Sequence, residues 1–116
     1  MRHNQTDYQK LAEKYPDFFK MHFGFECGPG WYKIIEKLTD DINAIIQRDN
    51  LEYCYAEQIK EKFGTLRYYL STETDEMSDL ILKAEDESEI TCEVCGNPGE
   101  LKNERYWLSV RCNECQ

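Results

Sequence analysis

The sequence predicts an α+β fold: a helical N-terminal body with an antiparallel β-hairpin, followed by a small cysteine-rich unit. Three observations predict it. Apolar residues recur at helical spacing over residues 31–48, and they alternate with polar residues in two runs between 51 and 71. Two cysteine pairs, Cys92-Glu-Val-Cys95 and Cys112-Asn-Glu-Cys115, close the chain with sixteen residues between them. We therefore divide the chain at about residue 90, into a body over 1–90 and a cysteine-rich unit over 91–116.

Composition and charge bound the classes of protein to which this chain can belong. With 116 residues and 41% hydrophobic side chains, it is long and apolar enough to form one folded domain with a real core. The formal net charge is −9, and residues 73–116 carry most of it, with twelve acidic and four basic side chains. A field of this sign repels phosphate groups, so we expect no general binding to nucleic acid or to anionic membranes.

The cellular compartment follows from what the N-terminal residues lack. The first six residues contain no apolar core of a signal peptide, and no run of the chain approaches the length of a membrane span. We expect a cytoplasmic protein, because cysteines stay reduced there and remain available to bind a metal.

The first helix is expected over about residues 7–15. Tyr8, Leu11 and Tyr15 lie on one face of such a helix, and Pro16 ends it. The run that follows, residues 17–25, is rich in phenylalanine and is expected to pack in the core. His22 lies in this run without a partner histidine, so we interpret it as a packed or surface residue and not as a ligand.

A tight turn precedes the most regular segment of the chain. In Cys27-Gly-Pro-Gly-Trp31 two glycines flank a proline, and a helix with one buried stripe is expected over about 31–48. The apolar positions of this stripe are Ile34, Ile35, Leu38, Ile42, Ile45 and Ile46. The N–H groups at the start of the helix offer a place for an anion, although a plain loop that begins a helix explains the same residues.

A β-hairpin is expected over about residues 51–71, with a turn at Gly64. Tyr53, Tyr55 and Ile59 alternate in its first strand, and Leu66, Tyr68 and Leu70 alternate in its second. Basic and aromatic side chains gather on or near this hairpin and form the predicted ligand-binding set: Trp31, Lys60, Lys62, Phe63, Arg67 and Tyr69. Such a mixture suits a ligand with a phosphate and a ring, because arginine binds phosphate through two hydrogen bonds and tyrosine can stack. A solvated strand face explains the same residues without a ligand.

A strongly acidic helix is expected over about residues 74–84. Residues 73–89 contain eight acidic side chains and one basic side chain, and Met77, Leu80, Ile81 and Ala84 have helical spacing. Acidic residues are unfavourable at a helix C-terminus, so we expect the helix to end near Lys83 or Ala84. Its outer face is either simply solvated or a docking surface for a basic partner.

The two cysteine pairs predict a structural zinc site with Cys92, Cys95, Cys112 and Cys115 as ligands. Two Cys-x-x-Cys pairs at this separation have the spacing of a zinc site, and four thiolates leave no open coordination position. Two disulfides or an iron centre are the alternatives. A hairpin turning about Asn103-Glu104 is expected between the pairs, with Trp107 on the face opposite Tyr106, Leu108 and Val110, which is the layout of a zinc ribbon. On this view, loss of the metal unfolds residues 92–115 and leaves the helical body partly folded.

Three segments resemble small proteins that bacteriophages and prophages carry. They are Cys27-Gly-Pro-Gly-Trp31, the stretch Ile59-Lys-Glu-Lys-Phe-Gly-Thr-Leu-Arg-Tyr-Tyr69, and Cys92-Glu-Val-Cys-Gly96 with the second cysteine pair. The resemblance covers roughly residues 20–115. It implies a context more than a mechanism, because small acidic phage proteins often disarm host defences or redirect host proteins.

Binding without catalysis is therefore the expected function. In one form the protein is a counter-defence protein that captures a nucleotide-like immune signal or blocks a host defence protein. In another it is a protein–protein adaptor stiffened by its zinc ribbon and anchored by Trp107, with no small-molecule ligand. An enzyme is the least supported reading, because only two histidines are present and the metal site is closed. DNA binding through the ribbon has only Arg105 and Arg111 to serve it. Two strands alone are marginal, so a second copy of the chain is a possible partner.

Overall fold

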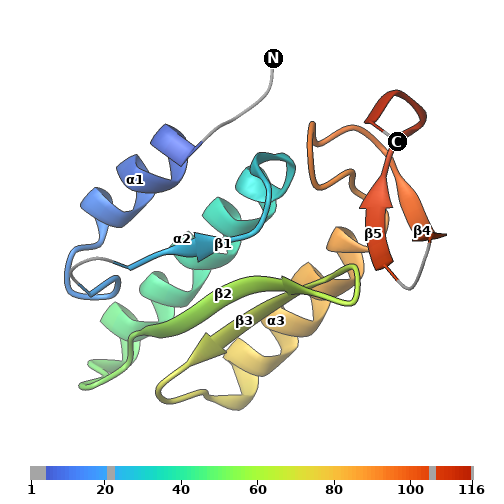
Figure 1. Ribbon diagram of the computed structural model, residues 1–116. Helices are drawn as coiled ribbons and strands as arrows, with labels where there is room; N and C mark the ends of the chain where they lie inside the picture. The colour runs from blue at the N-terminus through green and yellow to red at the C-terminus, as the bar shows by residue number, and fades with distance from the viewer. Residues whose placement is uncertain (1–4, 21–22, 105–106, 116) are drawn as a thin grey trace.

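The computed structural model describes residues 5–20, 23–104 and 107–115, and it confirms an α+β fold (Figure 1). The elements are α1 (Gln5–Lys14), β1 (Phe25–Glu26), a 3₁₀ turn η1 (Pro29–Trp31), α2 (Tyr32–Asp49), β2 (Ala56–Lys62), β3 (Thr65–Leu70), α3 (Asp75–Ser88), β4 (Glu100–Glu104), β5 (Trp107–Arg111) and η2 (Asn113–Cys115). The expected helices and hairpin are all present, with shifted ends. None of the helices in the described part of the chain has the length and apolar character needed to cross a membrane.

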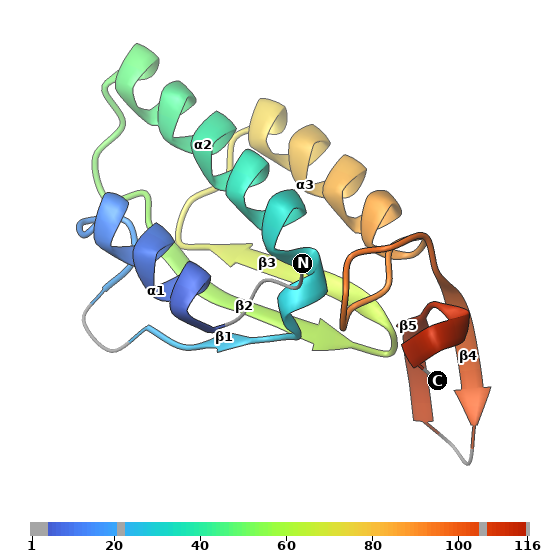
Figure 2. The same ribbon diagram turned by 90° about the horizontal axis from the view of Figure 1, so that it is seen from above.

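The body consists of a three-stranded sheet with two helices on one face. The strands lie in the order β1-β2-β3, with β1 parallel to β2 and β2 antiparallel to β3. Helices α2 and α3 cover the same face of this sheet, while α1 lies beside β1 (Figure 2). We call the covered face the inner face and the opposite one the outer face. Strand β1 is not predictable from the sequence, because a two-residue strand is too short to show alternation.

The core lies between the inner face and the helices. Residues Phe25, Ile59 and Tyr68 occupy one row across the three strands, and the last two are buried. The Tyr68 hydroxyl lies 2.7 Å from Thr39 Oγ1 on α2, so each buried hydroxyl has a partner. Four apolar residues of α2 are buried against this sheet: Ile35, Leu38, Ile42 and Ile45. The predicted stripe on this helix is therefore the centre of the core.

The hairpin is confirmed, but its first strand begins later than expected. Tyr53 is 83% exposed and has a φ of 61°, so residues 51–55 form a connection and β2 begins at Ala56. The two-residue turn between the strands has positive φ at both positions, 55° at Phe63 and 83° at Gly64. Such a turn matches the twist of paired antiparallel strands.

Helix α3 extends to Ser88, four residues beyond the expected end at Ala84. Tertiary contacts outweigh the unfavourable acidic C-terminus. The N–H of Leu66 points to the free edge of β3 and donates to Ser88 Oγ at 3.0 Å, and Ser88 is fully buried. Arg67 lies 3.6 Å from Glu85 on the same last turn. The helix continues because its last turn covers the edge of the sheet.

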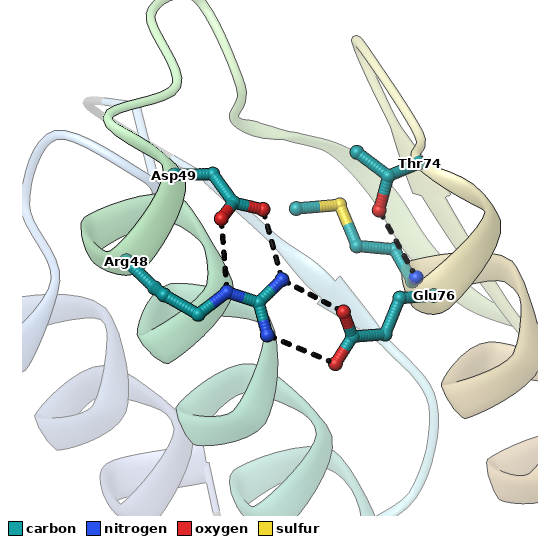
Figure 3. Close-up of polar contacts among 5 residues, drawn as sticks. Arg48, Asp49, Thr74 and Glu76 are labelled. Atoms are coloured by element: carbon teal, nitrogen blue, oxygen red, sulfur yellow. Dashed lines mark hydrogen bonds and ion pairs between the residues drawn. The ribbon is translucent and has the colours of Figure 1, made fainter.

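The other end of α3 is held by α2. Thr74 caps the helix by accepting a hydrogen bond from the N–H of Met77 at 3.2 Å. Arg48, in the last turn of α2, lies between Asp49 and Glu76 and contacts a carboxylate oxygen of each at 2.9 and 2.8 Å (Figure 3). These groups are exposed, so they fix the helix ends more than they stabilise the fold.

Candidate metal centre

The four cysteines predicted to bind a metal lie together. One sulfur from each of Cys92, Cys95, Cys112 and Cys115 lies within 4.8 Å of all the others, and the Cys95 and Cys112 sulfurs are 3.5 Å apart. A tetrahedral site with metal–sulfur bonds of about 2.3 Å places neighbouring sulfurs about 3.8 Å apart. The cluster can therefore hold a metal ion with little movement of the side chains.

The first cysteine pair lies on a tight knuckle. The N–H of Gly96 donates to the carbonyl of Cys92 at 2.9 Å, and the N–H of Cys92 donates to the carbonyl of Asn97 at 2.7 Å. Gly96 has a φ of 84°, a conformation that glycine adopts without strain. This reversal turns both sulfurs to the same side of the backbone.

The second pair is brought to the first by a short hairpin. Strands β4 and β5 pair in register from Glu100 opposite Arg111 to Glu104 opposite Trp107. Asn103 and Glu104 belong to β4, so the turn expected at these two residues is wrong, and the strands connect after Glu104. Residues 105 and 106 and the side chain of Trp107 lie outside what the structure describes, as does His22. The expected orientation of Trp107 and the expected roles of Arg105 and His22 stay predictions.

The thiols of the cluster interact with one another, and the pKa of Cys92 is lowered there while those of Cys95 and Cys115 are raised. Burial disfavours the charged form of Cys92, but hydrogen bonds from the backbone of Cys112, Cys95 and Val94 outweigh burial and lower the pKa of its thiol to about 6. The thiolate is the form that binds a metal. Cys92 and Cys112 are buried, while Cys95 and Cys115 are partly exposed.

The first knuckle is packed directly against the turn that begins α2. The N–H of Gly30 donates to the carbonyl of Glu93 at 2.6 Å, and the N–H of Gly28 donates to the Glu93 carboxylate at 2.7 Å. The indole N–H of Trp31 donates to the carbonyl of Thr91 at 3.0 Å. The knuckle and the core of the body therefore share three hydrogen bonds between residues that are sixty or more positions apart in sequence.

The two glycines of this turn are needed for the close approach. A Cβ atom at Gly30 would lie 2.1 Å from the carbonyl oxygen of Cys92, and one at Gly28 would lie 2.5 Å from the carbonyl oxygen of Glu93. Both obstacles are backbone atoms, which side-chain rotation cannot remove. The sequence signal was present in the spacing of the two glycines, but it did not identify the segment that they contact.

The anion position considered for this turn is filled from within the chain. The Glu93 carboxylate accepts from the N–H of Gly28, just before η1. Burial raises the pKa of Glu93, and the hydrogen bond from Gly28 opposes that rise. The carboxylate of Glu93, from the metal-binding unit, thus occupies the position at the turn where the sequence suggests that an anion could bind.

The predicted ligand-binding set is brought together in part. Lys60 lies opposite Arg67 in the register of β2 and β3, and Lys62 and Tyr69 face the same way, so these four are on the outer face. Phe63 is at the tip of the hairpin and is 66% exposed. Trp31 is the exception, because it is fully buried in the core. Its burial does not fit the expected ligand contact, and its observed role is to join the knuckle to the body.

The two remaining cysteines do not have the properties of nucleophiles. Burial raises the pKa of Cys27 to about 12, and its sulfur lies 3.7 Å from the Tyr8 hydroxyl. Burial also raises the pKa of Cys54, whose thiol lies 3.3 Å from the carbonyl of Thr72. Both thiols stay protonated at neutral pH.

Comparisons of the chain with protein-family models, with curated proteins and with solved structures found no match. The four-cysteine centre is therefore interpreted from its own geometry.

Proposed function

We propose that the protein is a small zinc-stabilised binding protein that acts by occupying a protein partner, without catalysis. The observation that carries this proposal is the packing of the first knuckle against Gly28, Gly30 and Trp31. A metal held by four thiolates beside a buried core is a structural metal, because it has no open position for a substrate. Zinc suits four thiolates and tetrahedral geometry better than the other common divalent metals.

A protein partner fits the outer face of the sheet better than a small molecule does. Small-molecule sites are concave and enclose most of the ligand, whereas no helix of the described residues lies on this outer face (Figure 2). Trp31, which was expected to form one wall of a ligand site, is in the core. A nucleotide-like signal remains the second candidate, favoured by the grouping of Lys60, Lys62 and Arg67 on one face.

The resemblance to phage proteins supplies the setting of this proposal. Such a protein acts in the cytoplasm of the host and blocks a host defence protein. A binding protein needs only a rigid surface for this task, and the shared hydrogen bonds hold the metal unit and the body as one surface.

The test uses the purified full-length protein in native mass spectrometry, before and after incubation with a nucleotide extract. We expect one zinc per chain and no added small-molecule mass. A second measurement captures partners from host-cell extract with the metal-loaded protein, using the metal-free protein as the control. A retained nucleotide overturns the protein partner in favour of signal capture. Another metal at full occupancy overturns zinc, and the absence of any metal-dependent partner overturns the proposed function.

A further inference from the structure

We propose that the partner surface is the outer face of the β2–β3 hairpin together with its tip, and that it binds an extended protein segment carrying an acidic residue and a large apolar residue. This inference rests on the proposed function, because it names the surface and the chemistry of the partner. The outer-face surface consists of Lys60, Lys62, Phe63, Arg67, Tyr69 and, from β4, Leu101.

The first step of the argument is an unfavourable pair of like charges. Lys60 and Arg67 are directly opposite each other on neighbouring strands, and like charges in this position destabilise a sheet. Lys62 adds a third cation two residues along the same face. The structure has two nearby carboxylates: Glu26 is next to Lys60 in the register of β1, and Glu85 is 3.6 Å from Arg67. Only the second of these is within ion-pair distance.

The cations are therefore incompletely neutralised. Within the described residues, neither Lys60 nor Lys62 has a carboxylate within 4.0 Å. The protein as a whole is strongly acidic, with a formal net charge of −9 that already includes these cations. An acidic segment is repelled by most of the molecule and attracted to this face, and this contrast orients it there.

The second step is an apolar patch at the end of the same face. Phe63 is 66% exposed and Leu101 is 52% exposed, and Tyr69 is 42% exposed on the sheet. The Lys62 ammonium lies 5.6 Å from the centre of the Phe63 ring, which joins the cations to the tip. A Cβ atom at Gly64 would lie 2.4 Å from Leu101 Cδ1, so the tip and β4 are in contact. A large apolar side chain of a protein partner can cover such a patch.

The spacing of the two features specifies the segment. Phe63 is three positions beyond Lys60, which corresponds to about 10 Å along a strand. An extended partner presents every second side chain to one face, so its acidic residue and its apolar residue are four positions apart, about 13 Å, and the flexible lysine side chain spans the difference. The patch combines residues of the body and of the metal-binding unit, so binding also requires the metal, although no surface residue is a ligand.

The test is an NMR titration of the ¹⁵N-labelled, metal-loaded protein with synthetic twelve-residue peptides. The probe has a central Glu-Ser-Thr-Ser-Trp, and its controls replace the glutamate by lysine or the tryptophan by serine. We expect the probe to shift the backbone resonances of Lys60, Lys62, Arg67 and Leu101, and both controls to bind at least about tenfold more weakly, equivalent to 1.4 kcal/mol. Equal binding of the lysine control, or shifts confined to other elements, overturns the proposal. ATP serves as a further arm, and its tighter binding at the same residues overturns the protein segment in favour of a nucleotide.

Matched variants separate the surface from the stability of the fold. Phe63→Ser and Leu101→Ser should weaken binding of the probe about tenfold, whereas Leu82→Ser, at a 58% exposed site on α3, should not. Lys62→Glu should weaken it as well, unlike Lys10→Glu on α1. If a partner captured from extract still binds the Phe63 and Leu101 variants, the surface assignment is wrong while the proposed function stands. If the metal-loaded protein captures no partner, the proposed function itself fails.

Discussion

The contact between the metal knuckle and the body can be tested by adding one carbon atom. In Gly30→Ala the new Cβ would lie 2.1 Å from the carbonyl oxygen of Cys92 and 2.6 Å from the amide nitrogen of Gly96, so the knuckle must move away. Gly30 does not lie in the positive-φ region, so alanine is compatible with its backbone. The effect of the substitution is therefore the effect of the displaced contact and not of backbone strain.

The size of the effect follows from the hydrogen bonds that are displaced. Moving the knuckle breaks the bond from the N–H of Gly30 to Glu93 and the bond from the Trp31 indole to Thr91, and both donors are buried. Leaving a buried donor without a partner costs about 1–3 kcal/mol. Replacing glycine by alanine stabilises by about 0.4–1 kcal/mol through the unfolded chain, which offsets part of this loss. With two such donors, we expect a net destabilisation of about 1–5 kcal/mol.

The assay is urea unfolding of the metal-loaded protein, followed by far-UV circular dichroism, with metal affinity measured by competition with a chromogenic chelator. Gly24→Ala is the matched control, because a Cβ at Gly24 meets no atom within 4 Å and its φ is not positive. Gly30→Ala should lose stability and bind metal more weakly, while Gly24→Ala should lose neither stability nor metal affinity. If the two variants unfold at the same urea concentration and bind metal equally, the knuckle does not depend on this contact and the reasoning is refuted.

Two further predictions concern the same framework. Cys112→Ser should lose the metal and also change the fluorescence of Trp31, measured in a Trp107→Phe background. The reason is that the knuckle that covers Trp31 no longer holds its shape. Unchanged Trp31 emission would show that the metal-binding unit folds independently of the body. Ser88→Ala should destabilise the protein by about 1–2 kcal/mol in thermal or urea unfolding, because the N–H of Leu66 loses its partner at the edge of β3. The control Thr72→Ala, at an exposed position, should not change stability. Equal stability of the two variants would show that Ser88 is not needed to extend α3.

Features that depend on neighbouring residues were predictable from the sequence. The four metal ligands follow from two local Cys-x-x-Cys spacings, and the buried stripe of α2 follows from helical periodicity. The turn at Gly64 follows from the requirement for positive φ. Each of these features depends on residues that are close together in the chain, so it can be predicted from a single sequence.

Features that depend on distant contacts were not predictable. Local charge predicts that α3 ends near Ala84, but the helix continues to Ser88. Ser88 accepts a hydrogen bond from the N–H of Leu66 at the edge of β3, twenty-two residues earlier in the chain. Sequence alone predicts Trp31 in a ligand site, because aromatic side chains suit a ligand with a ring. In the structure the indole N–H of Trp31 donates instead to the carbonyl of Thr91. The sequence contains no local signal for either partner.

The division of the chain into a body and a metal-binding unit stays a prediction, but the two parts are in contact. The expectation that metal loss leaves the body partly folded assumes two units joined only by the chain. The knuckle instead accepts hydrogen bonds from the body at Glu93 and Thr91, and a structural metal supplies folding free energy on the order of 10 kcal/mol in small metal-binding modules. This is comparable to the whole stability of a domain, about 5–15 kcal/mol. We therefore expect part of that free energy to reach α2 through Gly30 and Trp31, and a bound metal to stabilise the surface formed by the hairpin tip and β4 without touching it.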